Sequence, residues 1–150
     1  MKKALFLFDS EIEEEYIERI EKGIKEKVAE KFPFPLELIF KKGLPDTKPG
    51  NIKVYNAKEL EIMVRELRGM YKNVDFIGMF LNGFFYCYDD DEYPTRSMTH
   101  SLYRAFSVSC CKLRKGPYYP WEKETSLEEI LEDIMRYLKH LWLFNIIRKL

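Results

Sequence analysis

The densest group of side chains capable of chemistry is the acidic run at residues 89–92, which directly follows an aromatic, strand-like segment. Carboxylates at the end of a strand are ligands that Mg²⁺ uses in phosphodiester hydrolysis. Asp9 ends the first apolar segment and is a candidate partner for Asp89, Asp91 and Glu92. These residues predict a magnesium-dependent hydrolase as one alternative. The other interpretation is an acidic turn that solvates the end of a strand.

The two histidines of the chain are the next candidates. His100 stands beside Ser101, but neighbours in sequence do not make a catalytic triad, and no G-x-S-x-G elbow is present. We therefore predict that residues 93–104 form an exposed loop or a short helix. His140 lies among large apolar residues near the end of the chain. A zinc helix of the H-E-x-x-H type needs a second histidine four residues later, where Phe144 stands, so we predict no metal site there.

Basic and aromatic residues alternate in a third segment, which includes Arg114, Lys115 and Tyr118. Cations that bind phosphates and rings that stack on bases hold single-stranded nucleic acid in this way. The chain as a whole has 25 basic and 25 acidic residues, so no net charge attracts nucleic acid or an anionic membrane. We keep this function as a weaker alternative to an aromatic segment that packs within the protein.

Composition places the chain among globular proteins of one domain. It has 150 residues, of which 46% are hydrophobic and 33% charged. No apolar run reaches the length of a membrane span, and the start of the chain does not resemble a signal peptide, so we expect a cytoplasmic protein. Glutamine is absent while Glu and Lys are abundant, a pattern typical of thermophiles. Cys87, Cys110 and Cys111 are predicted to be buried small hydrophobes, and the alternative is a disulfide between Cys87 and either Cys110 or Cys111.

Three segments begin with the same helix-start signature, in which a capping side chain precedes a glutamate by three residues. They begin at Ser10, Asn56 and Ser126. Apolar residues follow each of them at spacings of three and four, which places them on one helix face. We therefore predict three main helices, the first of which ends at Pro33 and Pro35.

Apolar and aromatic segments between these helices predict β-strands. They cover residues 3–8, 36–40, 74–81, 84–88 and 105–113, with a short extra strand near 52–55. Asn82-Gly83 predicts a hairpin between two of them, and residues 116–123 predict a rigid aromatic loop. The order β-α-β-α-β-β-β-α indicates a single α/β domain over residues 1–150, with a mixed sheet of four to six strands.

Several short phrases accompany this order of elements. They are Val54-Tyr55-Asn56 before the second helix, FLNGF at 80–84, SCCKLR at 109–114 and the charged segment 132–139 before His140. Together they resemble the archaemetzincins, a branch of the metzincin zinc peptidases. That family has two βα units, a central strand, an edge hairpin, and a strand that leads into the zinc helix. The resemblance implies a metzincin-like fold in which His140 takes the place of the first zinc ligand.

The resemblance fails at the residues that would hold and use the zinc. The place of the general-base glutamate is taken by Leu141, that of the second histidine by Phe144, that of the glycine turn by Ile147, and that of the third histidine by Leu150. It therefore implies a relative of the metzincins without zinc and without peptidase activity.

Our leading hypothesis is a non-catalytic binding or regulatory domain with no cofactor. Its partner, another protein or a second copy of the chain, would bind to an aromatic surface that comprises Tyr118, Tyr119, Trp121, Trp142 and Phe144. The alternative is the magnesium-dependent phosphodiester hydrolase that uses Asp9 and the acidic run.

Overall fold

The computed structural model of the chain describes residues 1–44, 53–87, 94–111, 113–116 and 119–149. In 113–116, 119–123 and 145–149 only the backbone is described.

The main sheet has five strands in the spatial order β2-β1-β4-β8-β7. Its first four strands are parallel to one another: β2 (Leu36–Lys42), β1 (Lys2–Phe8), β4 (Phe76–Leu81) and β8 (Ala105–Ser109). The last strand, β7 (Ser97–His100), runs antiparallel to β8. All six residues of β4 are buried, as expected for an apolar strand that is covered on both faces.

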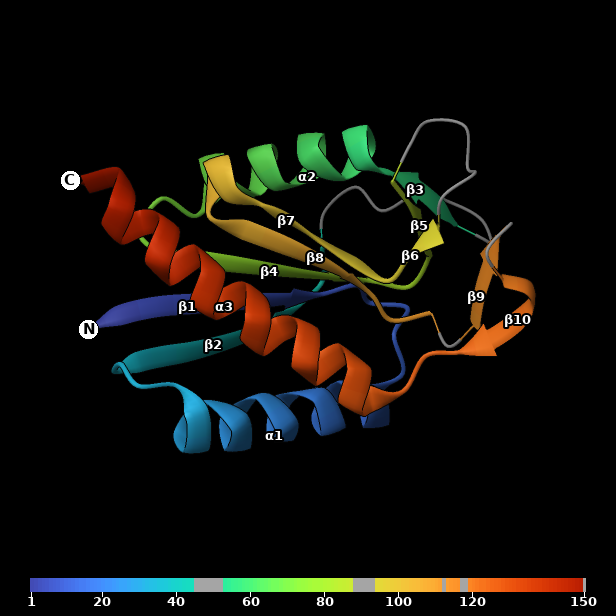
Figure 1. The fold of residues 1–150 in the computed structure, drawn as a ribbon, viewed down its shortest axis with the longest axis horizontal. Coiled ribbons are helices and arrows are strands. Elements are labelled where there is room, and N and C mark those ends of the chain that lie inside the picture. Colours follow the sequence, from blue (N-terminus) through green and yellow to red (C-terminus); the bar gives the residue numbers. More distant parts are fainter. Residues whose placement is uncertain (45–52, 88–93, 112, 117–118, 150) are drawn as a thin grey trace.

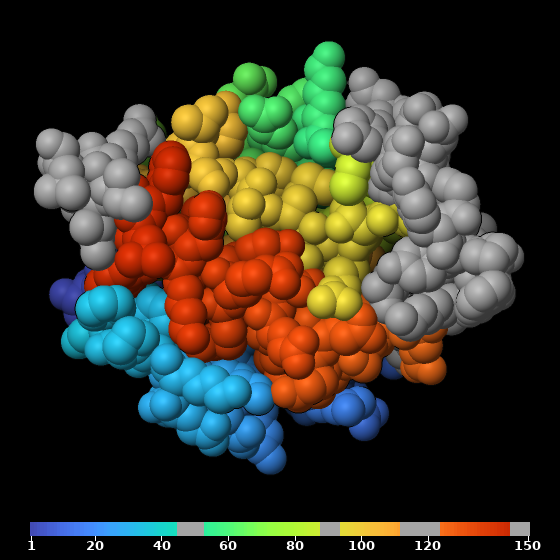
Figure 2. All heavy atoms as spheres, in the orientation of Figure 1, coloured from blue at the N-terminus to red at the C-terminus, as the bar shows by residue number. Residues whose placement is uncertain are grey.

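Three helices cover the two faces of this sheet (Figure 1). α1 (Glu14–Lys31) and α3 (Leu127–Lys149) lie together on one face, and α2 (Ala57–Met70) covers the other. Successive side chains of a strand point to opposite faces, so β1 contributes to two separate cores. Phe6 packs with α1 and α3, whereas Leu5 packs on the α2 side. In the space-filling view α3 fills the surface between α1 and the strands β7 and β8 (Figure 2).

Shorter strands gather at the end of the main sheet where its parallel strands finish (Figure 1). One small sheet has the order β3-β5-β6 and consists of β3 (Val54–Asn56), β5 (Phe84–Tyr86) and β6 (Pro94–Thr95). A separate antiparallel pair consists of β9 (Leu113–Gly116) and β10 (Tyr119–Glu124). Between β7 and β8 the chain forms one turn of 3₁₀-helix, η1 (Ser101–Tyr103).

The α/β class, the mixed sheet of four to six strands, the three main helices and the short extra strand are confirmed, and the main sheet has five strands. The hairpin predicted at Asn82-Gly83 is wrong, because β4 pairs with β1 and β8 while β5 leaves the main sheet to pair with β3 and β6. Gly83 is needed at this point for another reason. A Cβ there would lie 2.7 Å from the Tyr55 ring and 3.0 Å from the carbonyl oxygen of Lys53.

Two segments predicted as loops, and the predicted length of one strand, are also wrong. Residues 97–100 form a strand of the main sheet and not a loop or helix, and residues 119–124 form β10 and not an aromatic loop. The strand predicted over 105–113 ends at Ser109, and β9 begins separately at Leu113. The sequence of β7 is largely polar and that of β10 contains Pro120, so neither carries the apolar alternation that identifies strands.

The helix-start signatures are used to different extents. At Asn56 the capping box is complete: the Asn56 side chain accepts a hydrogen bond from the Glu59 N–H, and the Glu59 carboxylate accepts one from the Asn56 N–H. Ser126 accepts from the Glu129 N–H at 3.1 Å. The signature at Ser10 is wrong, because α1 begins at Glu14 and Glu13 makes no side-chain cap. In the part of the chain that the structure describes, no helix combines the length and hydropathy that crossing a membrane requires.

Candidate functional site

The inner face of α3 carries the apolar stripe expected from the sequence. Ile130, Ile134, Leu138 and Leu141 are all fully buried against the sheet and α1. His140 is exposed, with its Nε2 atom 3.2 Å from the hydroxyl of Ser101 in η1 and its ring stacked on Phe144. The neighbour of His140 that would need to be a general base, Leu141, is therefore part of the core.

A buried carboxylate, Asp133, interrupts this stripe and connects α3 to the main sheet. The guanidinium of Arg96, which lies between β6 and β7, donates to both of its oxygens at 2.6 and 2.9 Å. The hydroxyl of Ser97 donates a third bond at 2.6 Å, and Arg136 donates a fourth at 3.1 Å. Arg96 also pairs with Glu129, one turn earlier on α3.

Burial alone would raise the pKa of Asp133, but the hydrogen bonds from Arg96 and Ser97 and the charges of Arg96 and Arg136 hold it below its usual value. The same bonds raise the pKa of Arg96. With four donors the carboxylate has little capacity left to accept a proton or bind a ligand. Asp133 therefore acts as a structural cross-link between α3 and β7.

Sequence reasoning missed this cross-link, although one signal for it was present. Asp133 stands three residues after Ile130 and one before Ile134, on the face that the apolar spacing assigns to the core. A carboxylate at such a position is buried only when it is paired. Its partner Arg96 lies 37 residues earlier in a segment predicted to be a loop, so the sequence did not identify it.

A second buried polar group lies where β1 and β4 end. Asp9 is 0% exposed and accepts hydrogen bonds from the backbone N–H groups of Glu11 at 3.1 Å and Asn82 at 3.2 Å. The Lys53 ammonium, on a side chain that is 1% exposed, lies 2.9 Å from the Glu11 carboxylate and 3.9 Å from that of Asp9. Burial lowers the pKa of Lys53, but these carboxylates raise it more, so the lysine stays charged.

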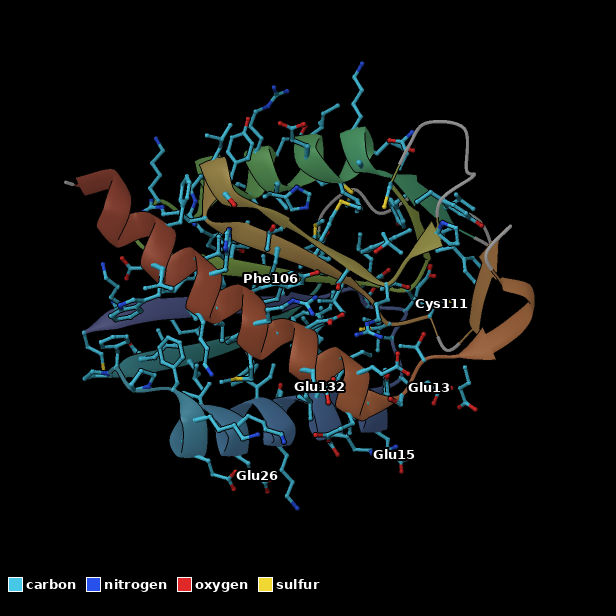
Figure 3. All side chains as sticks on the ribbon, viewed as in Figure 1. Glu13, Glu15, Glu26, Phe106, Cys111 and Glu132 are labelled. Atoms are coloured by element: carbon cyan, nitrogen blue, oxygen red, sulfur yellow. The ribbon has the colours of Figure 1, made fainter. Side chains whose placement is uncertain are left out.

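This location is where ligands commonly bind in open α/β sheets. After β1, the next strand of the main sheet, β2, lies on one side of β1, and the following one, β4, lies on its other side. The carboxyl ends of β1 and β4 therefore form a topological switch point. A cavity of about 80 Å³ opens there, and its walls are Glu11, Ile12, Glu13, Tyr16, Asn82 and Cys110. Glu13 and Cys111 lie at this same end of the sheet (Figure 3).

The groups around this cavity are not ionised nucleophiles. Burial raises the pKa of the Cys110 thiol, and the nearby Asp9 carboxylate raises it further. Burial likewise raises the pKa of Tyr16 to about 12. Pockets for small-molecule ligands usually measure roughly 300–1,000 Å³, and this cavity of about 80 Å³ holds only a few water molecules.

A larger pocket, of about 240 Å³, lies between the start of α2 and the segment β7–η1. It is lined by Ala57, Glu61, Met98, Thr99, His100, Ser101, Leu102 and Tyr103. His100 is buried and its Nε2 atom lies 3.0 Å from the Ser107 hydroxyl. Burial lowers the pKa of His100 to about 4, so the ring is neutral at physiological pH. The prediction that His100 stands in an exposed loop is therefore wrong.

The predicted catalytic residues are only partly described. Asp9 is a buried carboxylate that accepts hydrogen bonds from two backbone amides. Asp89, Asp91 and Glu92 lie outside the described residues, so the proximity of Asp9 to the acidic run stays a prediction. Among the residues that are described, no three His, Cys, Asp or Glu side chains gather as a metal site requires.

The predicted aromatic surface is also partly described. Tyr118 lies outside the described residues, and for Tyr119 and Trp121 only the backbone is described, as for the predicted nucleic-acid contacts Arg114 and Lys115. Trp142 is half-buried and its ring stacks on that of Phe34, with the centroids 4.4 Å apart. Phe144 is half-buried and stacks on His140. No disulfide joins Cys87 to Cys110 or Cys111. Cys110 is buried as predicted, whereas the buried position predicted for Cys87 is wrong, because its side chain is exposed.

Comparisons of the chain with protein-family models, with curated proteins and with solved structures find no match in any of the three.

Proposed function

We propose that the chain is a non-catalytic binding domain whose architecture is related to that of the metzincins and whose last helix holds no zinc. The observation that carries the proposal is the environment of α3. Where the family resemblance implies a zinc ligand followed by a general base, His140 is bonded to Ser101 and Leu141 is fully buried in the core.

The arrangement of elements supports the relationship to the metzincins. The resemblance implies two βα units, a central strand, an edge hairpin and a strand that leads into the last helix. The hairpin expected at Asn82-Gly83 does not form, because β5 pairs with β3 and β6, but the other elements are present. The chain has β1-α1-β2 and β3-α2-β4, with β7 at one edge of the main sheet. The central strand is β4, and β8 comes after the edge strand β7 and before α3.

The use of polar side chains supports the absence of catalysis. General acid–base catalysis needs a group that changes protonation near the working pH and can reach a substrate. Asp133 is held by four donors, His100 is neutral and bonded to Ser107, and Lys53 is paired with two carboxylates. Asp133 and Lys53 are thus tied into the fold, and His100, although it lines the pocket beside α2, stays neutral at physiological pH and bonded to Ser107.

The pocket beside His100 is the place where we propose that a partner binds. Met98, Leu102 and Tyr103 give it apolar walls, and Leu102 is 69% exposed at the surface. The volume of about 240 Å³ is small for a drug-sized ligand and suits one apolar side chain of another protein. Exposed apolar residues beside a pocket are typical of such contacts.

Metal analysis tests the first part of this proposal. The protein is purified with zinc supplied in the medium, beside a variant with His140→Ala, and both are measured by elemental analysis. We expect far less than one zinc per chain in both proteins. One zinc per chain in the unmodified protein that is lost from the His140→Ala variant would contradict the proposal.

Chemical-shift mapping tests the second part. N-acetyl-leucinamide is titrated into ¹⁵N-labelled protein, with N-acetyl-aspartamide as the polar control. We expect the amides of Met98, Thr99 and Leu102 to move with the leucine probe alone, and Met98→Asp to abolish the response. Equal responses to both probes would refute an apolar binding pocket at this position.

A further inference from the structure

The main sheet has two terminal strands, and an exposed strand edge offers unpaired N–H and C=O groups to another chain. The edge at β7 is four residues long and partly occupied. Ser109 N–H donates to the Arg96 carbonyl, so the next residue, Ser97, directs its backbone groups away from β8. The Ser97 carbonyl accepts a hydrogen bond from the Thr95 hydroxyl at 3.0 Å, which protects this edge.

The other edge, at β2, is longer and has no such protection. All seven residues of β2 pair with β1 in one unbroken parallel register, from Leu36 to Lys42. In the described part of the chain no side chain is hydrogen-bonded to the backbone of this strand. Figure 1 shows β2 as the last strand on its side of the sheet.

One hydrogen bond fixes which residues of β2 face outward. The Gly43 N–H donates to the carbonyl of Phe8 at 2.8 Å, and Phe8 lies opposite Lys42. In a parallel pair this places the backbone groups of odd-numbered β2 residues toward β1. The N–H and C=O groups of Leu38 and Phe40, and of the two residues at the strand's ends, therefore point away from the sheet.

We propose that this edge binds the same edge of a second copy of the chain, antiparallel and with the two-fold axis at Ile39. Leu38 then forms a hydrogen-bonded pair with Phe40 of the partner subunit, and Phe40 with Leu38 of the partner subunit. Such an interface is isologous, so the same strand serves both chains. The two five-stranded sheets join into one continuous sheet by strand addition.

Charge selects this register from the alternatives. Glu37 and Lys41 are both exposed on the same face of β2, two residues on either side of Ile39. With the axis at Ile39, Glu37 lies opposite Lys41 of the partner subunit, and the symmetric pair forms as well. An axis at Glu37 or at Lys41 would put like charges opposite each other. An axis at Leu38 or Phe40 would leave both charges without an opposite partner.

The lysines of β2 do not block the edge. Lys42 forms an ion pair with Glu14 at the start of α1, and the Lys41 ammonium lies 5.3 Å from the centre of the Tyr71 ring. Both side chains are thus held along the faces of the sheet and not across its edge. On the face toward α1, Leu38 and Phe40 are only half-buried, and pairing would cover more of their apolar surface.

Sedimentation of the full chain over a wide range of protein concentrations tests the proposal. We expect a concentration-dependent dimer, because one strand pair buries less surface than a standard permanent interface. Lys41→Glu, which sets like charges opposite each other twice, should raise the dissociation constant about tenfold. Glu37→Lys should do the same, and the variant with both changes should return close to the original value. Both side chains are exposed, and thermal unfolding of each variant checks that it folds.

Amide hydrogen exchange supplies an independent measurement. The Leu38 and Phe40 amides should exchange more slowly as the protein concentration rises, whereas the Ile39 amide, which faces β1, should be protected at all concentrations. A monomer at every concentration overturns the proposal. A dimer whose dissociation constant is unchanged in both single variants, or whose formation leaves Leu38 and Phe40 unprotected, also overturns it. The proposal is independent of the metal content of α3.

Discussion

Removing the Arg96 side chain should destabilise the fold through the buried carboxylate that it leaves behind. Asp133 has a side chain that is 1% exposed, and in Arg96→Met it would lose the two bonds at 2.6 and 2.9 Å. Breaking one side of a buried ion pair costs about 3–5 kcal/mol. Since Ser97 and Arg136 still donate to the carboxylate, we expect about 3 kcal/mol, the lower end of that range.

Arg136→Met is the matched control, because Arg136 donates to the same carboxylate from a side chain that is 63% exposed. Exposed pairs contribute about 0–1 kcal/mol. The free energies of unfolding in denaturant, followed by circular dichroism, give both values. Equal losses in the two variants would refute the assignment of Arg96 as the principal partner of Asp133.

The pH dependence of the Arg96→Met variant gives a second test. In the original protein the pKa of Asp133 lies below its unfolded value, so its stabilisation is complete above about pH 4 and is lost as the pH falls further. In Arg96→Met the largest offset to burial is gone and only Ser97 and Arg136 remain, so the pKa of Asp133 rises and the carboxyl can protonate inside the fold. The difference in stability between the two proteins should therefore shrink from neutral to acidic pH. A difference that grew in acid would contradict the reasoning.

Three further predictions follow from single sites. The His100 ring should titrate near pH 4 by NMR. Because this pKa lies below that of the unfolded chain, the free energy of unfolding should fall by about 3 kcal/mol between pH 6.5 and pH 4, and His100→Gln should abolish this fall. Gly78→Ala should lower the free energy of unfolding by about 1–3 kcal/mol, since the new Cβ would lie 2.6 Å from the Phe106 ring. In contrast, Gly69→Ala in α2 meets nothing within 4 Å and should raise the free energy of unfolding by about 0.5–1 kcal/mol. Asn56→Ala should cost about 1 kcal/mol by removing the cap of α2; a change under a few tenths in denaturant unfolding would contradict the capping box.

The sequence predicted those elements whose interacting residues lie within a few positions of one another. The capping box at Asn56 needs only the residue three positions later, and the apolar stripe of α3 repeats within each turn. The start of α1 was misplaced because Asp9 accepts from the Glu11 N–H and its carbonyl accepts from the Ile12 N–H, so the turn after β1 uses the residues assigned to the cap.

The remaining features depend on partners far away in the chain. β7 is polar because its side chains meet specific polar partners: Ser97 bonds to Asp133, and His100 bonds to Ser107. Such strands lack the apolar alternation on which strand prediction depends. The Lys53–Glu11 ion pair joins segments about forty positions apart, which no spacing rule identifies.

The most direct test of the account is a zinc titration of ¹³C,¹⁵N-labelled protein, followed through the ring resonances of His140. We predict that these resonances do not move at one equivalent of zinc, because the ring is bonded to Ser101 and, among the described residues, no three His, Cys, Asp or Glu side chains gather as a metal site requires. A shift of the His140 ring that saturates at one zinc per chain, together with shifts of other zinc-ligand side chains, would contradict it.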